Sequence, residues 1–236
     1  MDLTRVTMEA GGAGNPAVAV LEAVDLYRFF HAGDDETLAL RGVSLRLSPK
    51  EIVAVTGPSG SGKSTLLACL AGLDEPDGGN VRVGGEMMTR RPEAERAALR
   101  ARYIGMLFQT GNLLDHLTVR QNVVFAQRLA GRVDNARVAT LLAEVDLSAR
   151  ADASPAMLSG GEAARAGLAV ALANNPAVVL ADEPTGELDG TTALRIMQVL
   201  RAHAGAGAAV LIVTHNPAVS ALADREITVS DGRVAP

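Results

Sequence analysis

The chain has 236 residues, which is enough to bury a sizeable core and favours one domain with a subdomain or two small domains. Hydrophobic residues make up 48% but aromatic residues only 3%, so the core has to be built from Ala, Val and Leu. The net charge is −5, so the chain lacks the excess of positive charge that is typical of nucleic-acid-binding proteins, and no nucleic acid is expected among the partners. The single cysteine, Cys69, excludes an internal disulfide and suits the cytosol.

The first residues and the apolar runs bear on targeting. Residues 1–16 are Gly-rich, carry Asp2 and Glu9 and lack a basic start, which predicts a disordered tail rather than a signal peptide. The longest strongly apolar stretches, 177–181 and 208–213, have the length of strands and fall short of the roughly 18 residues that a membrane-crossing helix needs. The sequence therefore predicts no membrane span.

Strand patterns alternate with helical ones along most of the chain. The predicted strands are 18–24, 38–47, 52–56, 80–83, 103–108, 178–182, 210–214 and 226–230. Between Phe108 and Val178 the pattern is helical, with a capping box at Thr118 to Gln121 and an amphipathic helix over 134–145. This organisation predicts an α/β core interrupted by an inserted helical subdomain at about 110–175.

The most specific motif follows the apolar strand 52–55 and fits G-x-x-x-x-G-K-[ST]. It consists of Gly57, Pro58, Ser59, Gly60, Ser61, Gly62, Lys63, Ser64 and Thr65. Glycines let backbone N–H groups turn inward, and a helix starting near Lys63 adds its positive end, so the loop is expected to cradle the phosphates of ATP. Lys63 would reach the β- and γ-phosphate oxygens, and the Ser64 hydroxyl would ligate Mg²⁺. The alternative, a Gly/Ser-rich turn with one exposed lysine, explains neither the lysine nor the hydroxyl at its fixed offset.

A second motif ends the buried strand 178–182 with two adjacent acids, Asp182 and Glu183. The carboxyl edge of an open α/β sheet is where such folds bind ligands, and paired acids there are costly unless they are used. Strand side chains alternate, so the two should diverge, with Asp182 toward Mg²⁺ and Glu183 acting as the general base for the attacking water. The alternative is an acidic turn before Pro184.

The third motif, residues 158–162, contains Ser159, Gly160, Gly161 and Glu162 at the head of an Ala/Leu-rich helix. Ser159 and Glu162 have capping-box spacing, so an ordinary helix start is a serious alternative. That alternative does not explain two glycines in the first turn, where each weakens a helix by about 0.8–1 kcal/mol relative to alanine. Bare backbone at a positive helix end instead allows an anion to approach closely.

Taken together, these three motifs resemble those of the ATP-binding cassette (ABC) ATPases, and the resemblance covers about 18–233. It implies a P-loop NTPase core with a mixed sheet, an N-terminal antiparallel β portion and the helical insertion, all within one nucleotide-binding domain at 17–236. In this family the loop at Ser159 closes on the γ-phosphate held by the P-loop of a partner subunit. The resemblance also assigns Gln109 to the Q-loop that contacts Mg²⁺ and water, His215 to the switch that orients the γ-phosphate and the base, and Asp189 to the D-loop at the dimer interface.

Four positions depart from the usual family pattern. Phe30 stands where an adenine-stacking tyrosine is common and keeps the aromatic face without the hydroxyl. Glu162 replaces a more frequent glutamine, and Glu187 brings another carboxylate to the D-loop. Val170 stands where many relatives carry arginine. None of these removes the Lys, Asp, Glu or His on which hydrolysis depends.

Within the family, residues 104–109, 112–114, 117–119, 122–123 and 181–186 resemble the lipoprotein-release, macrolide-export and cell-division group. The resemblance implies an ATPase that uses ATP and Mg²⁺, dimerises head to tail with a second copy and drives a separate transmembrane permease through a groove beside 109–122. It would then lie in the cytoplasm, peripheral on the inner face of the membrane. Export or envelope work is expected. The substrate, the permease and the choice between homodimer and heterodimer are not fixed by the sequence.

Other classes remain open at this stage. Polar amino-acid importers share many of the same subgroup residues. A DNA-repair or chromosome-organising ABC ATPase would need long arms or zinc-binding cysteines, and a translation-type tandem protein would need a second P-loop; the chain has none of these. A regulator that binds ATP without hydrolysing it is disfavoured by the presence of both Glu183 and His215.

Overall fold

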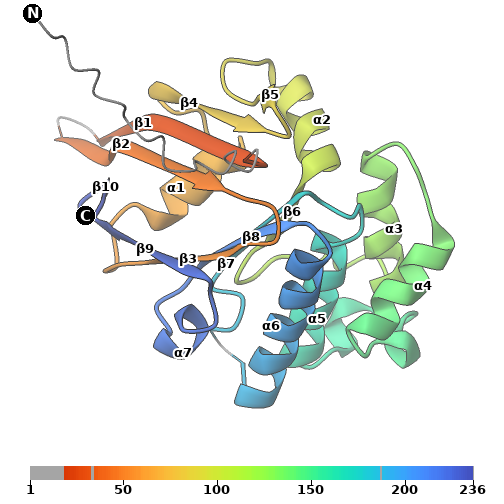
Figure 1. Ribbon diagram of the computed structural model, residues 1–236. Coiled ribbons are helices and arrows are strands. Elements are labelled where there is room, and N and C mark those ends of the chain that lie inside the picture. The colour runs from red at the N-terminus through yellow and green to blue at the C-terminus, as the bar shows by residue number, and fades with distance from the viewer. Residues whose placement is uncertain (1–18, 33–34, 187, 236) are drawn as a thin grey trace, which may run out of the picture.

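The computed structural model describes residues 19–32, 35–186 and 188–235. The tail predicted at 1–16 and the D-loop residue Glu187 lie outside the described residues. Figure 1 shows two sheets with one helix, α1 (Lys63–Leu70), between them, and a group of helices on the far side of the larger sheet. The predicted α/β architecture with a mixed sheet and an N-terminal antiparallel portion is confirmed.

The larger sheet carries the strand ends on which the predicted site depends. Its order is β10-β9-β3-β8-β7-β6, with β9, β3, β8, β7 and β6 parallel and β10 antiparallel at one edge. The strands are β3 (Ile52–Thr56), β6 (Ile104–Leu107), β7 (Val178–Asp182), β8 (Ala209–Val213), β9 (Arg225–Ser230) and β10 (Arg233–Val234). Parallel strands place their carboxyl ends at one edge, so the predicted motifs after β3, β6, β7 and β8 meet there.

The smaller sheet is antiparallel throughout, in the order β2-β1-β4-β5. Its strands are β1 (Leu21–Ala32), β2 (Asp35–Leu47), β4 (Gly78–Val83) and β5 (Glu86–Met87). The first strand continues well past the predicted end at Val24. The pairing register shifts between Ala23 and Leu26, where Asp25 has a φ of 49°. This bulge breaks the alternation of apolar residues, which hides the second half of the strand from a pattern of period two.

Side-chain alternation divides the interior into two cores, one on each face of the larger sheet. Val53 and Val55 of β3 pack with α1 and the smaller sheet, whereas Ile52 packs with the helices on the opposite face. The helix α1 contributes four buried side chains to the first core: Leu66, Leu67, Cys69 and Leu70. The burial of Cys69 agrees with its expected role as a small core residue.

Helices cover the second face of the larger sheet and extend beyond it (Figure 1). They are α3 (Val119–Leu129), α4 (Asn135–Glu144), α5 (Gly160–Ala171), α6 (Gly190–Gly205) and the short α7 (Pro217–Ser220), with 3-10 turns η1 (Ser148–Arg150) and η2 (Pro155–Met157). The capping box predicted at Thr118 to Gln121 is present at the start of α3. The helix predicted at 134–145 is α4.

One helix beside the smaller sheet, α2 (Glu93–Tyr103), was not predicted. Only Leu99 of its eleven residues is buried, and most of the others are charged or alanine. A helix with so narrow an apolar stripe has no strong periodic signal in the sequence.

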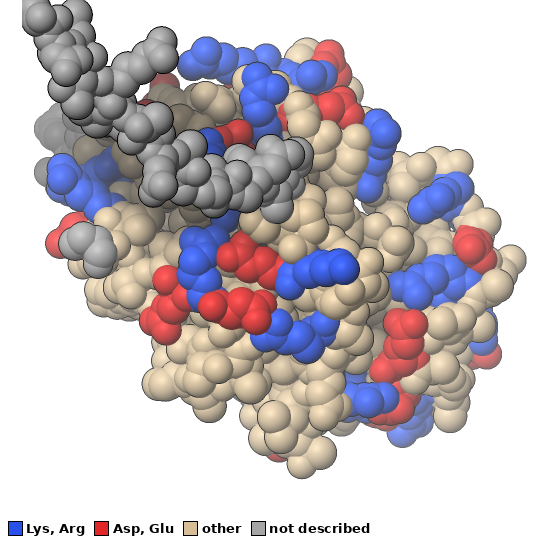
Figure 2. All heavy atoms as spheres, in the orientation of Figure 1, with Lys and Arg blue, Asp and Glu red and all other residues tan. Residues whose placement is uncertain are grey.

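Charged side chains of both signs are distributed over the surface. On the face shown in Figure 2, acidic and basic side chains lie next to one another among the described residues. In that same part of the chain, no helix combines the length and apolar character needed to cross a membrane.

Candidate nucleotide-binding and hydrolysis site

The loop between β3 and α1 follows a path that only glycine allows at two points. Gly57 has a φ of 140°, and a Cβ atom there would lie 2.0 Å from the carbonyl oxygen of Val229. Gly62 caps α1 with a φ of 101°, and its Cβ would lie 2.4 Å from the Ala39 carbonyl oxygen. The two glycines therefore let the loop pass against the backbone of β9 and β2 before the helix begins.

The polar side chains of this loop suit a polyanionic ligand. The Lys63 ammonium donates to the carbonyl oxygens of Gly57, at 2.9 Å, and Pro58, at 2.8 Å. The Ser61 hydroxyl is buried and has no hydrogen-bond partner among the described residues. A lysine held across the loop, an unsatisfied hydroxyl and a helix N-terminus together fit the phosphates of a nucleotide.

The loop borders an open cavity of about 550 Å³. Of the nine predicted P-loop residues, six line it: Ser59, Gly60, Gly62, Lys63, Ser64 and Thr65. Phe30 from β1 lines the same cavity, as do Gln109, Asp182 and Glu183 from the strand ends. The fold thus brings together predicted residues that lie up to 153 positions apart in the sequence, from Phe30 to Glu183.

Asp182 ends β7 beside the P-loop helix. The Ser64 hydroxyl oxygen lies 3.5 Å from its carboxylate oxygen Oδ2. Burial raises the pKa of Asp182, and the neighbouring charge of Glu183 raises it further. A partly buried carboxylate next to a serine hydroxyl and a phosphate loop fits Mg²⁺, which takes oxygen ligands from one or two protein side chains and from phosphates.

Glu183 turns away from Asp182 through its backbone rather than through strand alternation. The strand ends at Asp182, and Glu183 has a φ of 45°. Its N–H still donates to the Val213 carbonyl oxygen at 2.9 Å, which fixes the residue against the end of β8. The two carboxylates contact different groups, Ser64 and His215, and the left-handed backbone at 183 ends the strand alternation between them.

One oxygen of the Glu183 carboxylate has a hydrogen-bond partner, and the other has none among the described residues. The His215 Nδ1 lies 2.7 Å from Oε1, while Oε2 is buried without a hydrogen-bond partner among the described residues. Because an ionised carboxylate can only accept, this contact puts the proton of the imidazole on Nδ1. His215 lies two residues past the end of β8, and its side chain is 72% exposed, which leaves most of the ring accessible for a second contact.

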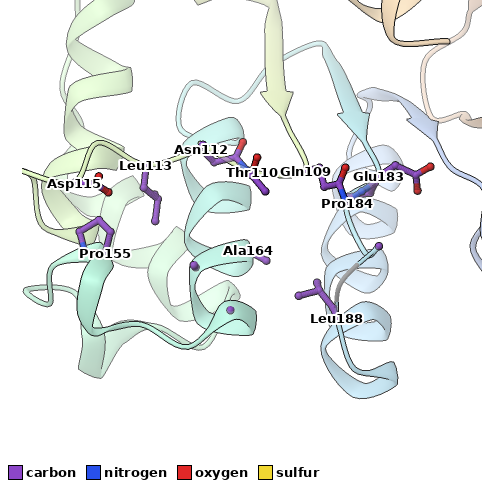
Figure 3. Close-up of a pocket in the computed structure, with 14 residues that line it drawn as sticks. Gln109, Thr110, Asn112, Leu113, Asp115, Pro155, Ala164, Glu183, Pro184 and Leu188 are labelled. Carbon is purple, nitrogen blue, oxygen red and sulfur yellow. The ribbon is translucent and has the colours of Figure 1, made fainter. Parts of the chain in front are cut away.

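Gln109 lies two residues past the end of β6 and lines two cavities. One is the cavity of about 550 Å³ beside the P-loop, which we call the nucleotide cavity. The other, of about 320 Å³, lies between the loop after β6, the start of α5 and the loop after β7. Figure 3 shows Gln109 and Glu183 at one side of this second cavity and Pro155 at the other. Gln109 therefore stands where the core of the molecule meets the helices.

The predicted signature loop starts α5 with a complete capping box. The Ser159 hydroxyl accepts from the Glu162 N–H, and the Glu162 carboxylate accepts from the Ser159 N–H at 2.9 Å. The second carboxylate oxygen accepts from Arg150 Nε at 2.9 Å. These hydrogen bonds lower the pKa of Glu162, and the bond from the Ser159 backbone has the largest effect. The charge that replaces the usual glutamine is thus compensated within the chain.

The signature residues do not line the nucleotide cavity of their own chain. Ser159 and Gly160 are exposed, and Gly160 borders the second cavity instead. Asp189, the predicted D-loop residue, caps α6: it accepts from the N–H groups of Thr191 and Thr192 and from the Thr192 hydroxyl. The hydrogen bond from the Thr192 side chain is the main cause that lowers the pKa of Asp189. Its assignment to nucleotide binding stays a prediction.

Seven of the residues that line the nucleotide cavity were missed by the sequence analysis, and three of them lie where the P-loop is joined to β2. Arg41 of β2 and the turn Asp231 to Gly232 between β9 and β10 line the nucleotide cavity. The Gly232 N–H donates to the Ser61 carbonyl at 3.0 Å, and its own carbonyl accepts from the Arg41 N–H at 2.7 Å. The turn thus fixes the P-loop to β2. An Asp-Gly pair between two strands is a recognisable hairpin signal, whereas Arg41 has no signal in the sequence.

Fold and site together define a P-loop nucleotide-binding protein with an acidic strand end and a helical insertion. Residues 40–186, which are more than half of the chain, match the family described as ABC transporter. The chain belongs to this family and is an ATP-binding and ATP-hydrolysing cassette.

Curated relatives agree with this assignment. The chain is 42% identical over 220 residues to the lipoprotein-releasing system ATP-binding protein LolD 1 of Rhodospirillum rubrum, covering 92% of this chain and 97% of that protein. It is 41% identical to the macrolide export ATP-binding/permease protein MacB of Salmonella typhi, again over 92% of this chain but only 34% of the relative. The chain thus spans about a third of the length of that relative.

Solved structures show the same fold in dimeric form. The ATP-binding cassette MJ0796, in a dimeric post-hydrolysis state bound to ADP and Pi, has a TM-score of 0.86 and 33% sequence identity, covering 92% of this chain and 97% of that one. A second structure, a nucleotide-free ATP-binding cassette from an ABC transporter, has a TM-score of 0.80 at 24% identity and shows the fold alone. The resemblance to the lipoprotein-release and macrolide-export group is confirmed by these relatives.

Proposed function

We propose that this cassette works as a head-to-tail homodimer on the cytoplasmic face of the membrane, where ATP binding and hydrolysis drive a separate permease in export or other envelope work. One observation carries the proposal: Gly160, the first residue of α5, serves no need among the described residues of its own chain. Neither Gly160 nor Gly161 has a left-handed φ. A Cβ atom on Gly160 would meet nothing within 4 Å, whereas one on Gly161 would lie 3.2 Å from Thr192 Oγ1, a tight contact, and 3.7 Å from Arg165 Nη1.

Glycine in the first turn of a helix has a cost that packing does not offset here. The exposed backbone at the start of α5 is therefore best explained by a ligand outside the chain, and a positive helix end suits an anion. In a twofold dimer the P-loop of one chain faces the signature loop of the other, so two copies complete two sites. The γ-phosphate held at Lys63 of one chain is the anion that we assign to Gly160 of its partner.

Within each site the residues divide the work as follows. Lys63 exchanges its two loop carbonyls for phosphate oxygens. Ser64, Asp182 and Gln109 would hold Mg²⁺, which would neutralise charge on the phosphates when bound. Glu183 receives the proton of the attacking water on Oε2, the oxygen without a protein partner. His215 orients Glu183 through Oε1 and reaches the γ-phosphate with its outer nitrogen.

The proposed permease contact is an apolar groove between α2, α3 and α5. It has a volume of about 620 Å³, and Leu73, Phe108, Leu129 and Val170 are among its lining residues. Leu129 is 65% exposed, which is unusual for leucine unless it is covered by a partner. Val170 lies here in place of the arginine of many relatives, and it keeps this wall apolar. An amphipathic helix from a permease suits such a groove.

None of the three leucines in the loop 113–117 lines this groove. Leu114 is the exposed one of the three, at 39%, whereas Leu113 packs against the second core. The groove is therefore assigned to residues outside the loop 113–117.

We also propose that residues 17–236 form a single nucleotide-binding domain and that 110–175 is its inserted helical subdomain. The chain positions Gln109 at the junction of these two parts, because the same residue borders the nucleotide cavity and the cavity against α5. The two relatives described above are named for lipoprotein release and macrolide export, which supports export over amino-acid import as the work of the complex.

The dimer is tested with Glu183→Gln, which slows hydrolysis and preserves the bound ATP. We expect size-exclusion chromatography to show a dimer at millimolar ATP and a monomer with ADP. A monomer in every nucleotide state would contradict the composite site.

The permease contact is tested with Leu129→Asp in the chain co-expressed with the permease from the adjacent reading frame. We expect ATP binding to be retained and co-purification to be lost. The control Leu222→Asp changes another exposed leucine that does not line the groove and should co-purify normally. Normal co-purification of Leu129→Asp would place the contact elsewhere.

A further inference from the structure

A guanidinium group covers one face of the ring proposed to stack on the nucleotide base. Arg28 and Phe30 lie two residues apart on β1, and the Arg28 Cζ atom lies over the Phe30 ring, 4.9 Å from its centroid. The Phe30 side chain remains 43% exposed and lines the nucleotide cavity. A base can therefore stack only on the part of the ring that Arg28 does not cover.

Arg28 is itself held in one orientation by two aspartates. Its Nε and Nη2 atoms donate to the two oxygens of Asp74 at 2.8 and 2.9 Å, and Nη1 donates to Asp77 Oδ2 at 3.1 Å. The Asp77 oxygen also accepts from the Phe29 N–H at 2.7 Å. A bidentate pair with a second carboxylate fixes the plane of the guanidinium, and the backbone bond at Phe29 fixes the strand that carries the ring.

The aspartates belong to the loop that follows α1, the helix that starts at the P-loop. The Asp74 N–H donates to the Ala68 carbonyl of that helix at 3.2 Å. An eight-residue helix is about 12 Å long, so its two ends are a fixed distance apart. One end carries Lys63 for the phosphates, and the other holds the loop that orients Arg28.

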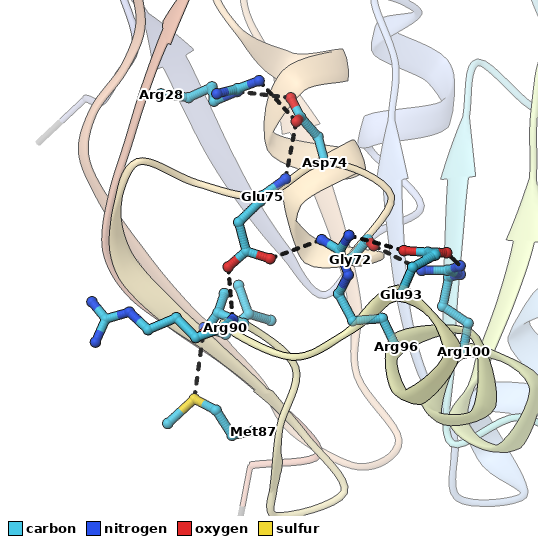
Figure 4. Close-up of polar contacts among 11 residues, drawn as sticks. Arg28, Gly72, Asp74, Glu75, Met87, Arg90, Glu93, Arg96 and Arg100 are labelled. Atoms are coloured by element: carbon cyan, nitrogen blue, oxygen red, sulfur yellow. Dashed lines mark hydrogen bonds and ion pairs between the residues drawn. The ribbon is translucent and has the colours of Figure 1, made fainter.

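A chain of ion pairs locks this loop from the other side (Figure 4). Glu75 pairs with Arg96 at 2.8 Å, and Arg96 pairs with Glu93 at 2.9 Å. Arg100 binds Glu93 and donates to the Gly72 carbonyl at 2.7 Å. The loop at 72–77 is thereby attached to α2 as well as to α1, which leaves Arg28 a rigid support.

We propose that Arg28 is a positioning residue for the nucleotide base: it backs the Phe30 ring and sets that ring at a fixed place relative to the phosphate loop. The proposal rests on the proposed stacking of adenine on Phe30. It predicts that loss of Arg28 weakens binding of the base without affecting binding of the phosphates. A purely structural role would affect both alike.

The test compares dissociation constants for ATP and for inorganic triphosphate, which lacks the base. Arg28→Gln should weaken ATP binding about three- to tenfold, the range of a partly desolvated cation–π contact. Triphosphate binding should be unchanged. Arg28→Lys keeps the cation without the planar fork, so we expect an intermediate effect on ATP and none on triphosphate.

The matched control is Arg102→Gln, which removes a guanidinium that lies over another ring, that of Tyr103 at 4.8 Å, and breaks one ion pair, with Glu86, but does not line the nucleotide cavity. Both ligands should bind to it as to the parent protein. Thermal unfolding of each variant separates a general loss of stability from the selective effect on ATP. If Arg28→Gln fails to fold, Arg28→Lys decides: equal weakening of ATP and triphosphate in it would overturn the proposal.

Phe30→Leu separates failure of this inference from failure of the proposed stacking. If Phe30→Leu leaves ATP affinity unchanged, the base does not stack on Phe30, and the site assignment itself is wrong. If Phe30→Leu weakens ATP binding and Arg28 variants do not, only the role of Arg28 is wrong. When both are right, the double variant Arg28→Gln with Phe30→Leu binds ATP no more weakly than Phe30→Leu alone, because the two residues act through one contact.

Discussion

The P-loop and the signature loop are both glycine-rich starts of helices, yet the fold requires glycine in only one of them. In the P-loop, Gly57 and Gly62 have left-handed backbones pressed against carbonyl oxygens of β9 and β2. In the signature loop, Gly160 and Gly161 have ordinary helical surroundings, and the helix start is secured by the side chains of Ser159 and Glu162.

This difference separates two reasons why a position needs glycine: the path of the chain itself, or the close approach of another molecule. The P-loop glycines shape the cradle before any ligand arrives, so their replacement should disturb the folded chain. Gly160 of the signature loop has no neighbour that a side chain would meet, so its replacement should disturb only what approaches from outside. Replacing a P-loop glycine should therefore lower the stability of the folded chain, whereas replacing Gly160 should leave that stability unchanged and weaken only the dimer.

The largest effect is expected at Gly57. Gly57→Ala forces a Cβ atom to within 2.0 Å of a backbone oxygen and should cost several kcal/mol of unfolding free energy, with loss of ATP binding. The control Gly60→Ala has a φ of 75° but open space around the new methyl group, so it should cost only about 1–2 kcal/mol. Chemical denaturation measures both. Equal losses at the two positions would mean that the close contact at Gly57 is not what requires glycine.

A smaller effect is expected at the cap of the signature helix. Ser159→Ala removes the hydroxyl that accepts from the Glu162 N–H and should lower the unfolding free energy by about 1 kcal/mol. ATP binding to the single chain should be unchanged, because Ser159 does not line the cavity of its own chain. A loss of ATP affinity in the monomer would show that the two loops are not separate in function.

The smallest effect is a gain in stability at Asp182, the proposed Mg²⁺ ligand. Burial raises the pKa of Asp182 above its ordinary value of 3.8, so ionisation of this group opposes folding. The opposition is absent well below pH 3.8, develops as the pH rises through the unfolded and then the folded pKa, and is constant above both. Asp182→Asn should therefore be more stable than the parent near neutral pH, with no such difference in strong acid, and should not hydrolyse ATP. Thermal unfolding over a pH series without Mg²⁺ measures this, and a less stable variant at neutral pH would contradict it.

The sequence predicted the parts of the site that lie on continuous apolar strands. The strands at 52–56 and 178–182 have the predicted boundaries, and the residues that follow them reach one cavity because parallel strands end at one edge. The continuation of β1 to Phe30 was hidden by the bulge at Asp25, and α2 by its narrow apolar stripe. The positions of Arg41 and Asp231 beside the nucleotide cavity, and of Arg28 over the Phe30 ring, depend on contacts between distant segments. A pattern along the chain does not contain such contacts.

The central claim is that the start of α5 receives the phosphates of a partner chain, and Gly160→Asp in the Glu183→Gln background tests it most directly. A carboxylate in the first turn favours the helix, so the single chain should be at least as stable as its parent and should bind ATP equally well. The same charge would face the incoming triphosphate, so the ATP-driven dimer should be lost on size exclusion. Gly160→Asn, of equal size but without the charge, should weaken the dimer less. An undiminished ATP-dependent dimer in the Asp variant would contradict the composite site.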